Sequence, residues 1–459
     1  MHGKIIVEIV FLFSCVIMIY LILRRPYLYI RLGIRRIRLD TYFIGALLSP
    51  LLLLVLGLLD YSQVLRGLQG EAGLNPFGIL LLFLSMVFMS IFLDVTGFFE
   101  YCARLALLYA KGDGKRLFFS MYMVVSVLTI FTSNDIIILT FTPFIYYFSK
   151  HAGIDPKPYL IAEFFAANTW SMMLYIGNPT NIILASAFHL YFDEYLRWML
   201  LPALSAGFVN MIILYMIFRR SITQPLRYVK MIKPSEAITD RVGAVLGVTI
   251  LSGCIVALAL APYVGVEMWI VSLSFALLLL IVLVVRDSYH SLLRSHLDKK
   301  NMVIRPTIKR MPFGIIPFVG ALFITVEALR SYGVMNDMGL FLTGIVNDNV
   351  MLSVLTVGFS SAFAANALNN IPMTVAYVPI ISVLPSNMSL SATLATAVGS
   401  NLGANITPIG ALAGIMWMGI LREKQVKVTF TEFTKYGLIA TPVTLLVCLG
   451  VLGLQFLLF

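Results

Sequence analysis

The sequence predicts an all-α polytopic membrane protein made of two inverted-topology repeats, each with a re-entrant helical hairpin and a broken transmembrane helix. Of its 459 residues, 60% are hydrophobic and 12% are charged, and the mean hydropathy is +0.93. Soluble domains carry about 25% charged residues, so a soluble enzyme, a nucleic-acid binder, a coiled coil and a disordered chain are all disfavoured. The distribution of basic residues and the polar interruptions of two apolar stretches supply the rest of the prediction.

The apolar segments can be assigned in order along the chain, because a spanning helix needs about 20 mainly apolar residues. The run 5–23 leads into Arg24 and Arg25 without a small-residue cleavage site, which predicts a retained helix rather than a signal peptide. Two longer stretches, 117–149 and 350–384, are broken at their centres by polar residues. The other candidates are 42–59, 77–110, 159–176, 198–218, 242–260, 268–285, 313–329, the segment ending at 416–421, and 435–459.

Lysine and arginine are concentrated in six loops, which hold 28 of the 33 basic residues. Cytoplasmic loops are enriched in these residues, so we expect all six on the cytoplasmic side and the N-terminus outside. Stretch 117–149 lies between two of these loops and stretch 350–384 between two base-poor loops, so each is predicted to enter and leave on one side. The net charge of +11 is therefore mostly a topology signal. The six loops are 24–40, 111–116, 150–158, 219–241, 286–310 and 422–435.

The same order of elements occurs twice, once starting outside and once inside, which is the construction common in secondary transporters. Three helices precede a hairpin, then a broken helix, then a last helix. The predicted division is a first repeat 1–218 with hairpin 117–149 and broken helix 159–190, a basic cytoplasmic linker 219–241, and a second repeat 242–459 with hairpin 350–384 and broken helix 390–421.

Local motifs support this symmetry. Nine residues separate Asn134 from Pro143 in the first hairpin, and nine separate Asn370 from Pro379 in the second. A further polar break follows in each half, at 177–181 (GNPTN) and at 403–410 (GANITPIG).

Irregular backbone survives at membrane depth only inside protein or beside water, because unsatisfied peptide groups in hydrocarbon cost several kcal/mol each. The four breaks therefore predict two hairpin tips that face two broken helices around a solute site. Helix N-termini there would suit an anion or an oxygen-rich neutral solute, and side-chain oxygens would suit a coupling cation. The alternative is that these residues only cap kinks in a packed helix bundle.

Acidic residues at membrane depth form a second signal, since a carboxylate there costs about 2.5–3.5 kcal/mol on insertion scales. Asp135 lies at the tip of the first hairpin and is the best candidate for a proton carrier, because burial favours the neutral acid. Asp94 and Glu327 lie late in the third helix of each half, where pairing with arginine is an equal alternative to function. Glu163 is interpreted as a residue at the cytoplasmic interface.

No cofactor, metal site or enzymatic centre is expected. The four cysteines are isolated in apolar runs, which supports neither a disulfide framework nor a thiolate site. The sequence contains no HExxH zinc motif and no GxxxxGK[ST] phosphate loop. Transport by this chain is therefore expected to use an ion gradient or a separate ATPase.

Four motifs in order resemble the arsenite/antimonite permease family of the ion transporter superfamily, which also includes citrate and dicarboxylate carriers. They extend from about residue 77 to the C-terminus and coincide with the third helix, both hairpins and the closing broken helix. They are 92–100 (FLDVTGFFE), 133–135 (SND) followed by Leu139 and Pro143, 367–372 (ALNNIP), and 399–410 (GSNLGANITPIG).

The resemblance implies a scaffold domain and a moving transport domain that holds both hairpins. It also implies a homodimer in the cell inner membrane that exports arsenite or antimonite coupled to proton influx, in some members with a soluble ATPase. Two features differ from that family. The break at 177–181 is closer to the Gly-x-Pro-x-Asn break of citrate and dicarboxylate carriers, and Asn401 stands where many arsenite permeases have an acid.

Two functional hypotheses therefore remain: an arsenite/antimonite exporter, and a sodium- or proton-coupled carrier of an organic or inorganic anion. Arsenite near neutral pH is an uncharged trihydroxide, and the four breaks contain no arginine or lysine, which fits a neutral solute. The predicted partners are the lipid bilayer and one small solute. The predicted solute site consists of Ser133, Asn134, Asn178, Thr180, Asn181, Asn369, Asn370, Asn401, Asn405 and Thr407, with Asp135, Asp94 and Glu327 as coupling residues.

Overall fold

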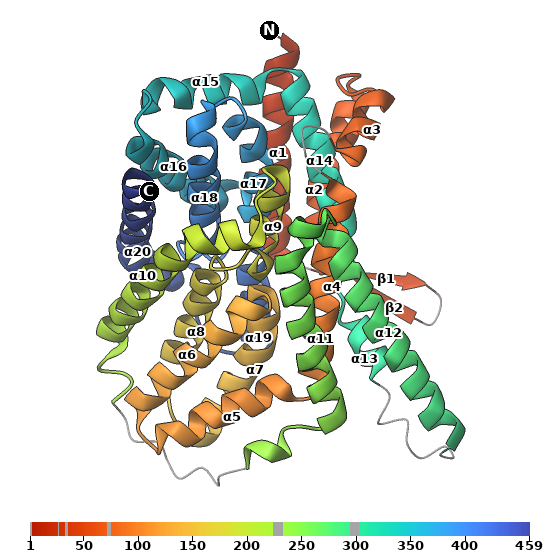
Figure 1. Ribbon diagram of the computed structural model, residues 1–459, viewed down its shortest axis with the longest axis vertical. Helices are drawn as coiled ribbons and strands as arrows, with labels where there is room; N and C mark the ends of the chain where they lie inside the picture. The colour runs from red at the N-terminus through yellow and green to blue at the C-terminus, as the bar shows by residue number, and fades with distance from the viewer. Residues whose placement is uncertain (1, 26, 33–34, 71–74, 224–232, 294–302) are drawn as a thin grey trace.

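The computed structural model describes residues 2–25, 27–32, 35–70, 75–223, 233–293 and 303–459 (Figure 1). Within these residues the chain is almost entirely helical, which confirms the predicted fold class. The elements of the first half are α1 His2–Arg24, β1 Tyr27–Leu32, β2 Arg35–Asp40, α2 Tyr42–Val55, α3 Tyr61–Gln69, α4 Pro76–Val95, α5 Phe98–Ala110, α6 Gly114–Phe131, α7 Asn134–Ala152, α8 Lys157–Trp170, η1 Tyr175–Gly177, α9 Pro179–Ala187 and α10 Phe192–Phe218. Those that follow are η2 Pro234–Glu236, α11 Arg241–Leu260, η3 Ala261–Val264, α12 Met268–Leu293, α13 Ile304–Lys309, α14 Ile315–Ser331, α15 Val334–Val346, α16 Val350–Leu368, α17 Asn370–Ile381, α18 Ser386–Gly403, α19 Leu412–Glu423 and α20 Phe430–Leu458.

The helices have the length and outer surface of membrane spans. In the described part of the chain, 8 helices are long and apolar enough to cross a bilayer, or 9 if α14 and α15, which meet at 72°, are one bent span. Large apolar side chains such as Ile281 and Val285 on α12 and Leu446 and Leu457 on α20 are exposed. Such a surface is stable against lipid and not against water, so this is a multi-pass membrane protein.

The inverted repeat is visible in the local structure. In each half, the helix that corresponds to the predicted third span (α4 and α14) is followed by a glycine in the left-handed region, Gly97 with φ +86° and Gly333 with φ +74°. The chain then turns into a 13-residue helix, α5 or α15. The two hairpins lie toward opposite ends of the long axis in Figure 1, α16 and α17 above and α6 and α7 below. One spacing of 236 residues separates Gly97 from Gly333, Asp113 from Asn349, Asn134 from Asn370 and Pro143 from Pro379.

The two halves are interleaved rather than placed side by side. Helix α4 of the first half packs against α11 and α12, whereas α14 of the second half packs against α1, α2 and α3. The predicted division at the linker 219–241, whose residues 224–232 lie outside the described residues, remains a prediction. Each of these two helices thus packs on helices of the other half or of the N-terminal segment.

The hairpins and broken helices occupy the predicted stretches. The first hairpin consists of α6 and α7 joined at Thr132 and Ser133, and the second of α16 and α17 joined at Asn369. The broken helices are α8 with α9 and α18 with α19, and each break spans eight residues, 171–178 and 404–411.

The second hairpin packs closely on its broken helix because two glycines lie at the contact. A Cβ at Gly399 would lie 2.0 Å from the Ser361 hydroxyl, and one at Gly403 would lie 2.6 Å from the Ala362 carbonyl oxygen. The side-chain-free faces of these glycines bring the α18 backbone against α16, which fixes the height of the hairpin tip relative to the break.

Three features differ from the sequence-based assignment. The basic segment 24–40 forms an antiparallel β-hairpin rather than the predicted loop, with Leu28 paired to Leu39 and Ile30 to Ile37. This segment alternates apolar and basic residues, and period-two alternation is typical of strands. The apolar segment 77–110 ends its first helix at Val95, where Gly97 turns the chain, and the short helices α3 and α15 were not predicted.

Candidate functional site

The first hairpin tip and the second broken helix are linked by a chain of buried amides. Asn134 Nδ2 donates to Asn168 Oδ1 at 2.9 Å, and Asn168 Nδ2 donates to Asn405 Oδ1 at 3.1 Å. Asn405 Nδ2 in turn donates to the Thr169 hydroxyl at 3.3 Å. Asn168 therefore joins two predicted residues from segments far apart in the sequence, although it was not itself predicted.

Asn401 connects the two broken helices. Its Oδ1 accepts from the Ser171 hydroxyl at 2.8 Å and from Asn178 Nδ2 at 2.9 Å. Its Nδ2 donates to Asn181 Oδ1 at 2.7 Å and to the Ala397 carbonyl at 2.7 Å. All of these side chains are buried, so Asn401 uses both ends of its amide to hold the first break against α18.

Other side chains extend this contact to the second hairpin. The Thr180 and Ser400 hydroxyls lie 3.0 Å apart. Asn366 Oδ1 accepts from the Thr407 hydroxyl at 2.6 Å, and Asn369 Nδ2 donates to the Ile409 carbonyl at 3.1 Å. Each of the four polar breaks thus contributes predicted residues to these contacts. Asn168, Ser171, Asn366 and Ser400 also take part, and sequence reasoning missed them.

Both hairpin tips carry buried oxygen atoms that have no hydrogen-bond partner within the described residues. They occur at paired positions of the repeat: Ser133 Oγ and Asn134 Oδ1 in the first tip, Asn369 Oδ1 and Asn370 Oδ1 in the second. A buried polar atom left unpaired costs about 1–3 kcal/mol. Four such oxygens in two symmetric places form a region that a hydrogen-bond donor or a cation would stabilise.

The second tip is also strained. Asn369 has φ +76° and ψ +151°, a region that is essentially restricted to glycine and costs about 1–3 kcal/mol for other residues. Strain of this kind persists where the surroundings hold the residue in place, and here the Ile409 carbonyl accepts from its side chain.

Replacing Asn369 by glycine and by alanine separates the backbone strain from the side-chain contact. Both lose the amide, but only alanine keeps the strain, so we expect Asn369→Gly to unfold at a higher temperature than Asn369→Ala in detergent. Glycine also lowers the free energy of unfolding by about 0.5–1 kcal/mol, because it makes the unfolded chain more flexible. The glycine variant should therefore be more stable than the alanine variant by about 1 kcal/mol. Equal stability, or a more stable alanine variant, would show that the residue is unstrained.

The three predicted acids have different surroundings. Asp135 lies in the first turn of α7, half-buried, and makes no hydrogen bond or ion pair within the described chain. Asp94 pairs with Arg310 at 2.5 Å, and Glu327 pairs with Arg66 at 3.2 Å. These two ion pairs favour the structural alternative for Asp94 and Glu327, whereas Asp135 remains the candidate coupling residue.

Glu163 differs most from its sequence-based interpretation. It is 2% exposed, in the middle of α8, and both carboxylate oxygens lie within 3.0–3.1 Å of the Thr142 hydroxyl on α7. An acid inside the apolar run 160–167 was a signal for this burial, but the nearby basic loop 150–158 made the interface reading equally compatible with the sequence.

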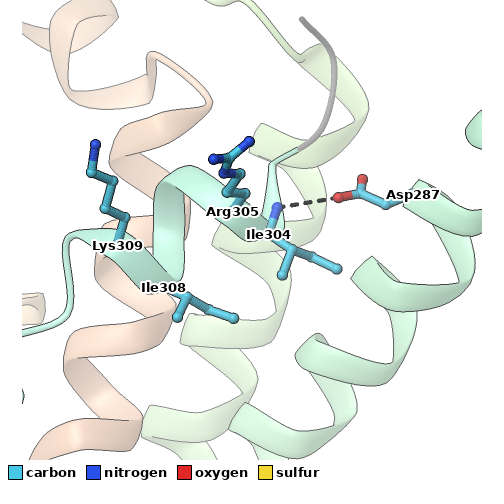
Figure 2. A pocket seen from close by; sticks show the side chains of 5 residues that line it. All are labelled: Asp287, Ile304, Arg305, Ile308 and Lys309. Atoms are coloured by element: carbon cyan, nitrogen blue, oxygen red, sulfur yellow. Dashed lines mark hydrogen bonds between the residues drawn. The ribbon is translucent and has the colours of Figure 1, made fainter. Parts of the chain in front are cut away.

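Of two cavities in the described residues, one borders the second polar break and the other lies apart from the predicted site. A cavity of about 340 Å³ is lined by Pro408 and Ile409 of the second break together with residues of α19 and the start of α20. A larger one of about 560 Å³ lies between α12 and α13, where Asp287 accepts a hydrogen bond from the Ile304 backbone N–H (Figure 2). None of the predicted site residues lines the larger cavity.

Interleaved inverted repeats, two hairpin tips and two broken helices that share a buried polar region define a membrane transporter. The comparisons agree with this class. The profile of the citrate transporter family matches residues 20–393, and this chain belongs to that family.

The curated relatives have related names. The arsenical pump membrane protein of Escherichia coli strain K12 is 26% identical over 378 residues, which cover 81% of this chain and 85% of that protein. The arsenical pump membrane protein of Yersinia enterocolitica is 28% identical with the same coverage. An uncharacterized transporter of Mycobacterium tuberculosis is 27% identical over 85% of this chain and 88% of its own. The resemblance inferred from the motifs is therefore confirmed.

Solved structures share the fold. The YdaH transporter of Alcanivorax borkumensis superposes with a TM-score of 0.55 at 15% identity, covering 99% of this chain and 98% of its own. MtrF of Neisseria gonorrhoeae, described as one of a class of antimetabolite efflux pumps, gives 0.52 at 12% identity, covering 98% and 94%.

Proposed function

We propose that this chain is a secondary active transporter that exports arsenite or antimonite, coupled to proton influx, by elevator-type alternating access. The observation that carries the proposal is the set of four unpaired buried oxygens at the hairpin tips. Arsenite trihydroxide offers three O–H donors and no charge, so it can satisfy such oxygens without a cationic pocket. The four breaks carry no lysine or arginine, which supports a neutral solute.

The proposed roles follow the contacts. Asn134, Asn369 and Asn370 present oxygens to the solute. Asn178, Asn181 and Asn401 hold the first break against α18, and Asn405 links the second break to the first tip through Asn168. Asp135 carries the coupling proton. The transport domain would contain both hairpins and move against a scaffold formed by the interleaved helices α1, α2, α4, α11, α12 and α14.

A second candidate is a sodium- or proton-coupled carrier of citrate, a dicarboxylate or an inorganic anion. The match to the citrate transporter family supports this candidate. The unpaired oxygens at the hairpin tips also support it, because hard cations prefer carbonyl-type oxygen ligands. A bound cation would then offset the charge of an anion in a site without basic side chains.

The setting of the protein belongs to the same proposal. We expect it in the cell inner membrane as a homodimer, with the basic loops cytoplasmic and the N-terminus outside. A soluble ATPase subunit is a further partner to test, and no nucleic acid is expected to bind.

Everted membrane vesicles test the two candidates directly. Vesicles with an acidic interior should accumulate arsenite and antimonite, should lose this accumulation when the pH gradient is collapsed, and should be indifferent to sodium. Citrate and sulfate serve as the competing solutes, with vesicles lacking the protein as the control. Arsenite movement that does not depend on the pH gradient would contradict the first candidate. Sodium-dependent accumulation of an anion instead of arsenite would also contradict it and would support the second candidate.

A further inference from the structure

Glu163 is a buried carboxyl group without a counter-ion. It is 2% exposed, and the Thr142 hydroxyl lies 3.0 and 3.1 Å from its two carboxylate oxygens. The indole N–H of Trp417 also lies beside this carboxyl group. No lysine, arginine or histidine side chain in the described ranges forms an ion pair with it. The negative charge of an ionised Glu163 would therefore be nearly uncompensated.

The charged groups on the surrounding elements lie at the ends of those elements. Helix α18 carries no charged residue. Asp135 occupies the first turn of α7, seven residues from Thr142. Early in α20, Glu432 pairs with Lys157 at 3.0 Å, and Lys435 follows on the same helix. The other charged or titratable groups lie at helix ends: Lys115 and Arg116 start α6, Lys150 and His151 end α7, Asp193, Glu194 and Arg197 start α10, and Arg422 and Glu423 end α19.

Isolated charges in a low-dielectric interior are expensive, several kcal/mol per ion even after relaxation. Such a carboxylate is stabilised either by a bound metal cation or by a proton. A metal cation would need several more oxygen ligands, and the neighbouring chain offers rings instead: Phe164 packs on Trp417 and Phe433, and Phe165 also packs on Phe433. The surroundings of Glu163 therefore suit a proton rather than sodium.

Polar side chains lie on α7 to either side of this carboxyl group, about two helical turns away in each direction. Asn134 contacts Asn168 across the same pair of helices, α7 and α8, at the hairpin tip. In the other direction Ser149 lies seven residues, or two helical turns, after Thr142 on the same face. The Ser149 hydroxyl is buried without a hydrogen-bond partner in the described residues, next to the exposed end of α7.

We propose that Glu163 is a second protonation site of this transporter, which binds a proton in the conformation described and exchanges it along Thr142 and Ser149 with the side of the loop 150–158. This rests on the proposed function insofar as the proton serves coupling. In the step itself, the carboxyl O–H bond breaks, the proton passes to water on that side, and the carboxylate remains with the Thr142 hydroxyl as its donor.

The first test reads the proton without transport. Infrared difference spectra of the purified full-length protein, parent minus Glu163→Gln, should contain the C=O band of a protonated carboxylic acid near neutral pH. Thr142→Val should move that band to higher frequency, because the carbonyl loses its hydrogen bond. Glu432→Gln, which removes a partly exposed paired acid, should leave the band in place. A difference spectrum without a protonated-acid band at any pH at which the protein stays folded would overturn the proposal.

The second test reads coupling in proteoliposomes loaded with arsenite. Solute exchange by the parent protein should vary with pH and should accelerate when a pH gradient is imposed. In Glu163→Gln the exchange should no longer vary with pH, and the imposed gradient should change its rate less than twofold. A variant that keeps the parent's full response to the gradient contradicts the coupling role.

The two proposals fail in distinguishable ways. If the parent protein moves no arsenite, the proposed function is wrong, but the infrared band still decides whether Glu163 holds a proton. If Glu163→Gln does not fold, Thr142→Val carries both readouts, since threonine and valine have nearly the same volume. An unshifted band in Thr142→Val would show that the band does not come from this site.

Discussion

Replacing Asn401 by leucine is expected to lower transport at least a hundredfold while the protein still inserts into the membrane. Asn401 holds Ser171, Asn178 and Asn181 through both ends of its amide. Leucine fills a similar volume but leaves these buried groups unpaired, at about 1–3 kcal/mol each. The sum is enough to release the first break from α18. Ser171 of this break donates to the Asn168 carbonyl, and the Asn168 side chain accepts from Asn134, a proposed solute ligand.

The control for this substitution is Asn387→Leu, in the exposed first turn of the same helix α18. It should change transport less than twofold. Gradient-driven uptake and thermal unfolding would be measured on both variants in the same membranes. An Asn401→Leu protein that transports within twofold of the parent would show that the contact between the breaks is dispensable.

A second substitution at this position adds a pH dependence. In the parent protein, Asn401 Nδ2 donates to Asn181 Oδ1 and to the Ala397 carbonyl. In Asn401→Asp a carboxyl oxygen takes the place of this nitrogen. A deprotonated carboxylate would set oxygen against oxygen at both acceptors, whereas the O–H of the protonated acid can still donate to one of them. Transport by Asn401→Asp should therefore fall as the pH rises, which is the reverse of a carboxylate needed in its charged form.

The positions of the breaks could be predicted from sequence because a membrane chain gives polar residues few other reasons to occur in apolar runs. The hairpins at 117–149 and 350–384 were found in this way, and the tip asparagines followed from them. The partners of those asparagines could not be predicted. A single polar residue in a regular helix, such as Asn168 or Ser400, breaks no pattern, and its importance depends on contacts with residues more than 200 positions away.

Packing between the halves was also outside the reach of sequence reasoning. The order of apolar segments is the same whether α4 packs on its own half or on α11 and α12, as it does here. The turns at Gly97 and Gly333 were present in the sequence, but a single glycine in an apolar run does not indicate a left-handed backbone until its 236-residue counterpart is aligned with it.

The second large effect is expected at Asp135. Asp135→Asn keeps the size of the side chain and its place in the first turn of α7 but cannot release a proton. If Asp135 carries the coupling proton, an imposed pH gradient should no longer drive accumulation of arsenite in everted vesicles, a loss of at least tenfold.

Asp113→Asn is the matched control, because Asp113 caps the neighbouring helix α6 outside the membrane span. Backbone hydrogen bonds from Arg116 and Lys115 hold the pKa of Asp113 below its ordinary value. A group with a lowered pKa stays charged throughout the neutral range and loses its contribution to folding only as the pH falls through that pKa. Asp113 therefore carries no proton near neutrality, and its amide variant should keep the full response to the gradient.

Comparison with Glu163 decides how the two acids share the task. Asp135 is half-buried at the hairpin-tip end of α7. Thr142 lies two turns further along α7, and it contacts the buried Glu163 of the neighbouring helix α8. If one proton passes between them, Asp135→Asn and Glu163→Gln should each abolish the response to the gradient, and the double variant should be no worse than either. If each binds its own proton, each single variant should keep part of the response and the double variant none. Retention of the full gradient response and pH dependence by Asp135→Asn would remove Asp135 from the mechanism and leave Glu163 as the coupling acid to test.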